Sequence, residues 1–168
     1  TYTRKTFSPR RYEIWTMQAG YHNLPAICGT DQKDGEEYRA GNVVTELTGT
    51  EPSISMELAA AYPDAGAVVP GLTYSRKVTL KKPSNTVVLE DYANAQDVIL
   101  NFITYEKPVF LSDGKLSIGE ASASFEGADL LAIETLPITD ARLKTAWDHD
   151  LYRIRLKGND AGFRLTIQ

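Results

Sequence analysis

The chain has 168 residues, of which 42% are hydrophobic and 24% charged, and its formal net charge is −4. This length and apolar content suit one globular domain with its own core, which we assign to residues 1–168. The acidic balance argues against general nucleic-acid binding, and no apolar run is long enough to span a membrane. The single cysteine, Cys28, excludes an internal disulfide and leaves the cellular compartment open.

The N-terminal residues are basic. Arg4, Lys5, Arg10 and Arg11 occur among the first twelve positions, which contain no acidic residue. This cluster is either a solvated terminus or a local basic patch for an anionic ligand. We therefore keep Arg10 and Arg11 as candidate ligand contacts.

The hydrophobic pattern that follows has a period of two, which is typical of half-buried antiparallel strands. Alternation places Trp15 and Met17 on one face of an expected strand, opposite Tyr12 and Ile14. Further along the chain the same period predicts strands over 53–58, 98–103, 121–125, 152–156 and 163–167.

Turn signals separate these strands. Asp34-Gly35 and Asp113-Gly114 predict hairpins, and 81–85 and 157–162 predict turns. Short helical turns are expected over 56–64, ended by Pro63, and over 139–147, capped by Asp140. We interpret 62–71 as a surface crossover between sheets. The predicted fold is all-β: an antiparallel two-sheet β-sandwich of about ten to twelve strands with at most one or two short helical turns.

The residues alone indicate little chemistry. A nucleophile elbow, a phosphate loop and a Cys/His metal cluster are absent from the sequence, which contains only two histidines. His22 is either a strand histidine with one structural hydrogen bond or a ligand. His149, between Asp148 and Asp150, marks a turn or a weak cation site. Aromatic side chains suit either the core or stacking on sugar rings, and Trp15 and Tyr21 are among the candidates.

Four segments carry a resemblance to a known family. They are YHNLPAICGTDQ with its Tyr21-His22-Asn23 tripeptide, AYPDAGAV followed by YSRKVTL, VVLEDYANAQDVILNFITYEKP, and DARLKTAWDHDLYRIRL. Their ordered combination resembles the β-sheet domain of the heparinase II/III family of polysaccharide lyases, which has a tyrosine–histidine–asparagine signature.

The resemblance implies that this chain is the C-terminal portion of a larger enzyme. In the family, a helical toroid joins a β-sandwich, and anionic polysaccharide or oligosaccharide binds between them and is cleaved by β-elimination beside a uronic acid. The resemblance implies that His22 is a zinc ligand that acts together with upstream ligands. The catalytic tyrosine would also lie upstream. Tyr21 and Asn23 would lie beside the substrate, and Arg10, Arg11 and Trp15 are our further candidates for substrate contact.

We expect the isolated chain to hold little zinc and to catalyse nothing. We also expect an exposed apolar face where the toroid would dock, which would favour a homodimer. The family implies a periplasmic or extracellular location. A non-catalytic carbohydrate-binding module and a purely structural β-domain are the alternatives to the lyase interpretation. A His22 that points to the edge where the missing domain would dock, beside a basic cleft, would favour the lyase. A row of coplanar exposed aromatic rings, with glycan binding by this chain itself, would favour the binding module. A His22 buried against backbone would favour the structural domain.

Overall fold

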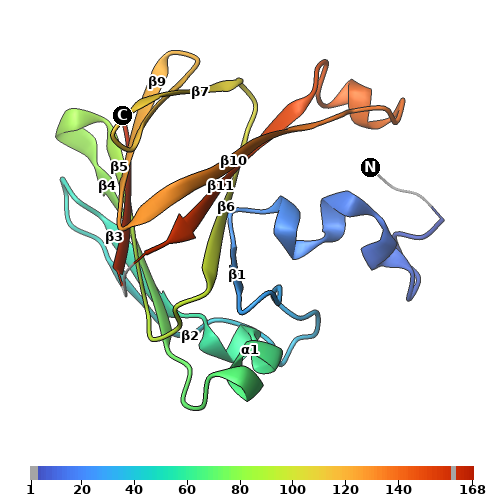
Figure 1. The fold of residues 1–168 in the computed structure, drawn as a ribbon, viewed down its shortest axis with the longest axis horizontal. Helices are drawn as coiled ribbons and strands as arrows, with labels where there is room; N and C mark the ends of the chain where they lie inside the picture. Colours follow the sequence, from blue (N-terminus) through green and yellow to red (C-terminus); the bar gives the residue numbers. More distant parts are fainter. Residues whose placement is uncertain (1–3, 160–161) are drawn as a thin grey trace.

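The computed structural model describes residues 4–159 and 162–168 and contains two antiparallel sheets that face each other across one core (Figure 1). The four-stranded sheet has the order β1-β6-β11-β10, and the eight-stranded sheet has the order β2-β3-β4-β5-β12-β9-β8-β7. The predicted all-β fold with two sheets is therefore confirmed. The strands among the described residues are β1 (Pro25–Ile27), β2 (Gly41–Glu46), β3 (Ser53–Glu57), β4 (Tyr74–Lys81), β5 (Thr86–Ala93), β6 (Val98–Thr104), β7 (Pro108–Ser112), β8 (Lys115–Ile118), β9 (Ala121–Glu126), β10 (Ala128–Leu136), β11 (Leu151–Gly158) and β12 (Gly162–Ile167).

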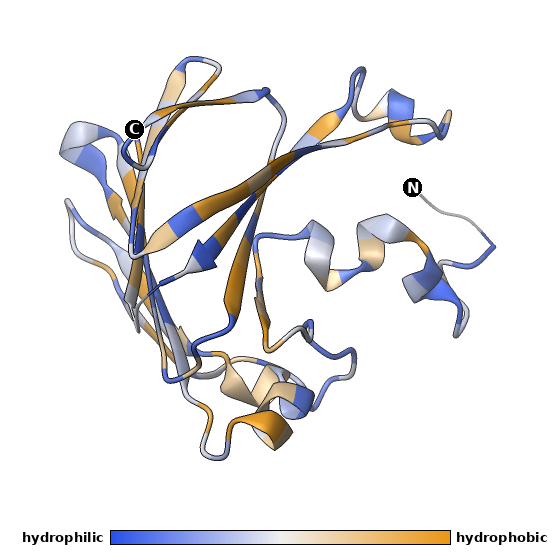
Figure 2. Cartoon of the chain, viewed as in Figure 1, coloured by the Kyte–Doolittle hydropathy of each residue, from blue (hydrophilic) through white to orange (hydrophobic). Residues whose placement is uncertain are grey.

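Apolar side chains at alternate positions of the strands fill the space between the sheets. Phe102 and Ile154 point inward from the four-stranded sheet and are buried, as are Phe163 and Leu165 of β12. The rings of Phe102 and Phe163 stack across the core with their centroids 6.1 Å apart. Apolar residues recur along the strands, whereas the loop beyond Cys28 is largely hydrophilic (Figure 2). All five strands predicted over 53–58, 98–103, 121–125, 152–156 and 163–167 are present.

Two of the predicted turns are confirmed. Asp113 and Gly114 both have positive φ, 46° and 71°, as a type I′ hairpin between β7 and β8 requires. Residues 81–85 connect β4 to β5 through the 3₁₀ turn η5 (Lys82–Ser84) and the left-handed Asn85. The predicted turn over 157–162 lies partly outside the described residues, between the end of β11 and the start of β12.

Short helical turns outnumber the one or two that we predicted. The described residues contain one α-helix, α1 (Pro63–Val68), and six 3₁₀ turns. The expected turn over 139–147 is η6 (Leu143–Thr145), and the Asp140 carboxylate accepts the Arg142 N–H at 2.7 Å, as its capping role predicted. In the other predicted segment, the 3₁₀ turn η4 (Ala59–Ala61) comes first and α1 begins at Pro63, because proline is well suited to the first helical position.

Two local predictions are wrong. Asp34-Gly35 lies in the loop between β1 and β2, which belong to different sheets, so no hairpin can form there. Residues 62–71 are not a surface crossover between sheets. They connect the neighbouring strands β3 and β4, and Tyr62 and Ala65 are buried in the core. The Tyr62 hydroxyl donates a hydrogen bond to the Pro25 carbonyl at 2.9 Å, which ties this connection to β1.

Exposed apolar side chains gather on the two edge strands of the eight-stranded sheet. They are Val43 and Val44 of β2 with Leu47 just beyond it, and Val109, Phe110 and Leu111 of β7. Edge strands of this kind are common sites of contact with another chain. Among the described residues, no helix is long and apolar enough to cross a membrane.

Candidate functional site

The N-terminal segment is not the strand that alternation predicted. Three consecutive 3₁₀ turns occupy it: η1 (Arg11–Glu13), η2 (Trp15–Met17) and η3 (Ala19–Tyr21). These turns lie beside the outer face of the four-stranded sheet, where Trp15 and Tyr21 pack against a small apolar cluster of Leu136, Ile138, Leu143 and Leu151 (Figure 1). Compact turns bring both rings onto this cluster, which a single extended strand would not do.

His22 is held in place by its neighbours in the segment 20–24, which we call the histidine segment. The Arg153 guanidinium donates to the Gly20 carbonyl at 2.8 Å, and the Arg76 guanidinium donates to the Asn23 carbonyl at 2.8 Å. The Asn23 side-chain oxygen accepts the Ile103 N–H at 2.8 Å, so it takes the place of a strand carbonyl beside β6. Two arginines and one strand therefore fix the backbone on both sides of His22.

Arg76 belongs to a buried ion pair. Its guanidinium binds the Asp91 carboxylate through two hydrogen bonds of 2.7 and 2.6 Å, and the Tyr74 hydroxyl donates to the same carboxylate at 2.6 Å. The side chains of Arg76 and Asp91 are only 8% and 3% exposed. Burial alone would lower the pKa of Arg76, but the hydrogen bonds and charge of Asp91 outweigh burial and raise it.

Arg153 supports the segment from the other side. Its guanidinium hydrogen-bonds Glu134 at 2.6 and 2.8 Å and lies 4.6 Å from the centre of the Tyr21 ring. The Tyr21 ring meets the edge of Trp15 at a centroid distance of 5.1 Å. Partial burial would raise the pKa of Glu134, but hydrogen bonds and charge from Arg153 and Arg155 hold it below its ordinary value.

The lowered pKa of Glu134 predicts a pH-dependent contribution to stability. Because the folded-state pKa lies below the unfolded one, this contribution is present above the unfolded pKa of about 4.3 and is lost as pH falls through the folded pKa. Glu134→Gln should therefore lower the free energy of unfolding at pH 7 and lower it less at pH 3. Urea unfolding of both proteins at the two pH values measures this, and an equal difference at both would contradict it.

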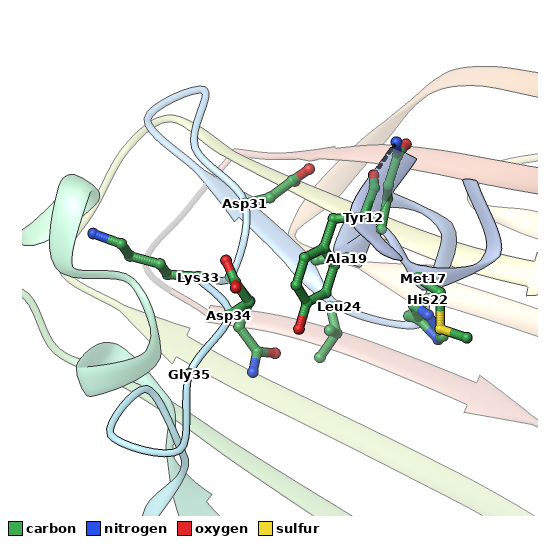
Figure 3. A pocket seen from close by; sticks show the side chains of 11 residues that line it. Tyr12, Met17, Ala19, His22, Leu24, Asp31, Lys33, Asp34 and Gly35 are labelled. Carbon is green, nitrogen blue, oxygen red and sulfur yellow. Dashed lines mark hydrogen bonds between the residues drawn. The ribbon is translucent and has the colours of Figure 1, made fainter. Parts of the chain in front are cut away.

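The His22 side chain is exposed and lines a groove that we call the loop groove. It has a volume of about 420 Å³ and lies between the 3₁₀ turns and the loop after β1. Figure 3 shows His22 beside Met17 at one end of the groove, the Tyr12 ring in the middle, and Asp31, Lys33 and Asp34 at the other end. Two carboxylates and one amine give this groove a slightly acidic character. The basic cleft that the lyase interpretation expects beside His22 is therefore not found in this groove.

The described residues do not make a metal site around His22. No three His, Cys, Asp or Glu side chains come together there or elsewhere in residues 4–159 and 162–168. Because zinc sites use three or four protein ligands, these residues alone do not fit a zinc ion. Any zinc bound through His22 would need ligands from outside them.

His22 also lines a second groove, the tryptophan groove, of about 320 Å³. Its walls come from the N-terminal turns, from Ile103 of β6 and from the end of the β10–β11 connection. The lining residues are Trp15, Thr16, Tyr21, His22, Asn23, Ile103, Trp147 and Leu151. Four of the predicted site residues, Trp15, Tyr21, His22 and Asn23, therefore meet in one place.

The two predicted arginines lie elsewhere. Arg10 is bound to Glu13 by hydrogen bonds of 2.6 and 2.8 Å, and Lys5 binds the same carboxylate at 2.6 Å. Arg11 lies 5.5 Å from the centre of the Tyr12 ring. Neither arginine lines either groove, and Glu13 partly neutralises the expected basic patch.

The second histidine sits in a turn, as one of its two interpretations predicted. The His149 ring nitrogen Nδ1 lies 2.7 Å from the Asp150 carbonyl oxygen, and the ring packs on Tyr105 at a centroid distance of 4.0 Å. The Tyr105 hydroxyl donates to Asp148, and this hydrogen bond lowers the pKa of Asp148. These side chains bind one another rather than converge on a cation.

No protein-family model and no curated protein matches this sequence. The residues of this site that the pattern missed are Arg76, Asp91, Trp147 and Arg153. Two of them had a detectable signal, because Arg76 and Asp91 fall on the inward-facing positions of apolar strands, where an unpaired charge would be costly.

Proposed function

We propose that this chain is the C-terminal β-sandwich of a heparinase II/III-like polysaccharide lyase that cleaves uronic-acid-containing polysaccharide by β-elimination. In this proposal the histidine segment lies beside the bound polysaccharide. The upstream toroid completes the site, and the present chain is inactive alone. A homodimer contact would form through the face where the toroid docks, and the exposed apolar edges of the eight-stranded sheet are our candidates for that face.

The observation that carries the proposal is the convergence of the resembling segments. Asn23 comes from the first of them, Tyr62 and Arg76 from the second, Asp91 from the third and Arg153 from the fourth. Arg76, Asp91 and Arg153 hold the backbone around His22 directly or through one another, and Tyr62 binds Pro25 just beyond it. Polar residues from all four resembling segments thus support the backbone on either side of one exposed histidine.

β-Elimination removes the C5 proton of the uronic acid and expels the oxygen on C4. The reaction needs an acid and a base within hydrogen-bond reach and a way to offset the charge on the neighbouring carboxylate. Here His22 is an exposed imidazole on a backbone held by two arginines and β6, so it is suited to contact substrate or to bind a group supplied from upstream. Because the loop groove is slightly acidic, the charges that attract an anionic polymer would come from the upstream part of the protein.

The test is a lyase assay on the longer protein, with the upstream region restored. Ultraviolet absorbance of the unsaturated uronate product is followed on heparan, heparosan, hyaluronan, chondroitin and alginate. We expect activity on at least one polymer, a loss of about 100-fold or more in His22→Ala, and none in the 168-residue chain.

His149→Ala is the matched control, because His149 is the only other histidine, is also exposed, packs on Tyr105 and lines neither groove. It should keep near-normal activity. A folded longer protein that is inactive on all five polymers would contradict the proposal. Equal losses in the two histidine variants would contradict the role of His22.

A non-catalytic carbohydrate-binding module is the second candidate. The tryptophan groove favours it, because that groove combines partly exposed aromatic surface with polar groups, although the rings of Trp15 and Tyr21 are inclined at 65° and are not the coplanar row expected of such a module. In that case the 168-residue chain would bind saccharide, and the longer protein would not cleave it.

A further inference from the structure

The only two tryptophans of the chain come from its opposite ends and line the same groove. Trp15 lies on η2 and Trp147 follows η6, and both side chains remain partly exposed although they pack against the same apolar cluster. We propose that the tryptophan groove is a subsite that binds one pyranose ring of a saccharide, with Trp147 as a stacking residue. The proposal rests on the proposed function for the class of ligand.

The groove has the two kinds of surface that a sugar ring presents. Trp15, Trp147, Ile103 and Leu151 offer an apolar surface that matches the C–H face of a pyranose. Polar groups of Thr16, His22 and Asn23 line the same groove and match the hydroxyl edge of the ring. A few polar groups on a mainly apolar lining are typical of small-ligand sites.

The Asn23 side chain is already oriented to bind the hydroxyl edge of a sugar ring. Its side-chain oxygen is used by the Ile103 N–H, which fixes the orientation of the amide. Within residues 4–159 and 162–168 the amide NH₂ group has no protein partner, so it is free to donate to a hydroxyl. A donor that is oriented before binding loses little freedom when the ligand arrives.

The absence of charged side chains from the groove lining indicates which part of the saccharide it binds. The lining residues include no Asp, Glu, Lys or Arg side chain, and the nearby Arg153 is already paired with Glu134. The groove therefore matches the uncharged face of a ring and not its carboxylate. Binding by this subsite should depend weakly on salt, because it releases no counterions and forms no ion pair.

Tryptophan fluorescence reports on this groove alone, because both tryptophans of the chain line it. The variants Trp15→Phe and Trp147→Phe each keep one tryptophan, and both are titrated as the 168-residue chain with heparosan and hyaluronan hexasaccharides at 50 and 500 mM NaCl. We expect the emission of both variants to change with the same dissociation constant, and that constant to change less than about twofold with salt.

Affinity is tested with Trp147→Ala, which should bind about tenfold more weakly, while Trp147→Phe keeps most of the affinity. Urea unfolding verifies that Trp147→Ala is folded. If Trp147→Ala does not fold, the emission of the two Phe variants still tests the proposal. Emission that changes in only one variant, or in neither, overturns the proposal. Binding that weakens steeply with salt also overturns it, because the ligand would then be held by charges elsewhere.

The outcomes separate this subsite from the proposed function. The titration uses the chain that is expected to be inactive, so it reports binding without cleavage. If the longer protein has lyase activity but hexasaccharide does not change the tryptophan emission, the subsite proposal is wrong and the lyase proposal stands. Hexasaccharide bound in the groove, combined with an inactive longer protein, would support the subsite and indicate the carbohydrate-binding module.

Discussion

Asp91→Asn should lower the free energy of unfolding by about 3–5 kcal/mol, which is the usual cost of removing one partner of a buried ion pair. The substitution keeps the size of the side chain but removes the charge that balances Arg76. Both side chains are almost fully buried, and the Tyr74 hydroxyl donates to the same carboxylate. The Arg76 guanidinium would then keep its charge in the core without compensation. Urea unfolding at pH 7 measures the loss.

Glu90→Gln is the matched control for this prediction. Glu90 precedes Asp91 on β5, and its carboxylate pairs with Arg164 at 3.3 Å on the outer face of the sheet, where the Arg164 side chain is 45% exposed. Water and mobile ions weaken such a pair, so we expect a loss below about 1 kcal/mol. A double variant, Arg76→Met with Asp91→Leu, removes both charges and should be more stable than Asp91→Asn. Equal losses in Asp91→Asn and Glu90→Gln would contradict this account.

Asp91→Asn should also loosen the histidine segment. The Arg76 guanidinium also donates to the Asn23 carbonyl, so a displaced arginine would release the backbone beside His22. Amide hydrogen exchange should therefore speed up at Leu24 in Asp91→Asn and not in Glu90→Gln. The buried pair thus links the core of the sandwich to the exposed site.

Sequence patterns predicted the strands well and the N-terminal segment poorly. Successive side chains of strands such as β11 and β12 tend to alternate between the core and solvent, and the sequence shows this as alternating apolar and polar residues. Residues 11–21 show a similar alternation but form 3₁₀ turns, because Trp15 and Tyr21 pack on the outside of a sheet built from distant residues. No local pattern specifies that surface.

The candidate site was predicted in part. Trp15, Tyr21, His22 and Asn23 are near neighbours in sequence, so their meeting in one groove needed only a compact segment. Trp147 joins them through the β10–β11 connection, and a contact between residues so far apart in the chain cannot be predicted from the pattern of a single sequence. The arginines were missed for a related reason, since their roles depend on which carbonyl groups lie opposite them in the folded chain.

Gly127→Ala should be the most damaging single glycine substitution, with a loss of about 3 kcal/mol or more, and Gly29→Ala is its matched control. Gly127 joins β9 to β10, where the chain passes from the eight-stranded sheet to the four-stranded sheet, and its φ is +73°. A Cβ there would overlap the Gly162 carbonyl oxygen, a backbone atom held in β12. Left-handed backbone strain adds about 1–2 kcal/mol, and forced overlap in a packed region about 1–3 kcal/mol more.

Gly29 has nearly the same φ, +72°, but open space around its Cβ position, so Gly29→Ala carries the strain without the overlap. We therefore expect Gly29→Ala to lose only about 1–2 kcal/mol, and the difference between the two variants in urea unfolding to measure the overlap alone. Equal losses would mean that β12 shifts freely to admit the methyl group. The crossing between the sheets would then be far less rigid than the close contact of Gly127 with Gly162 indicates.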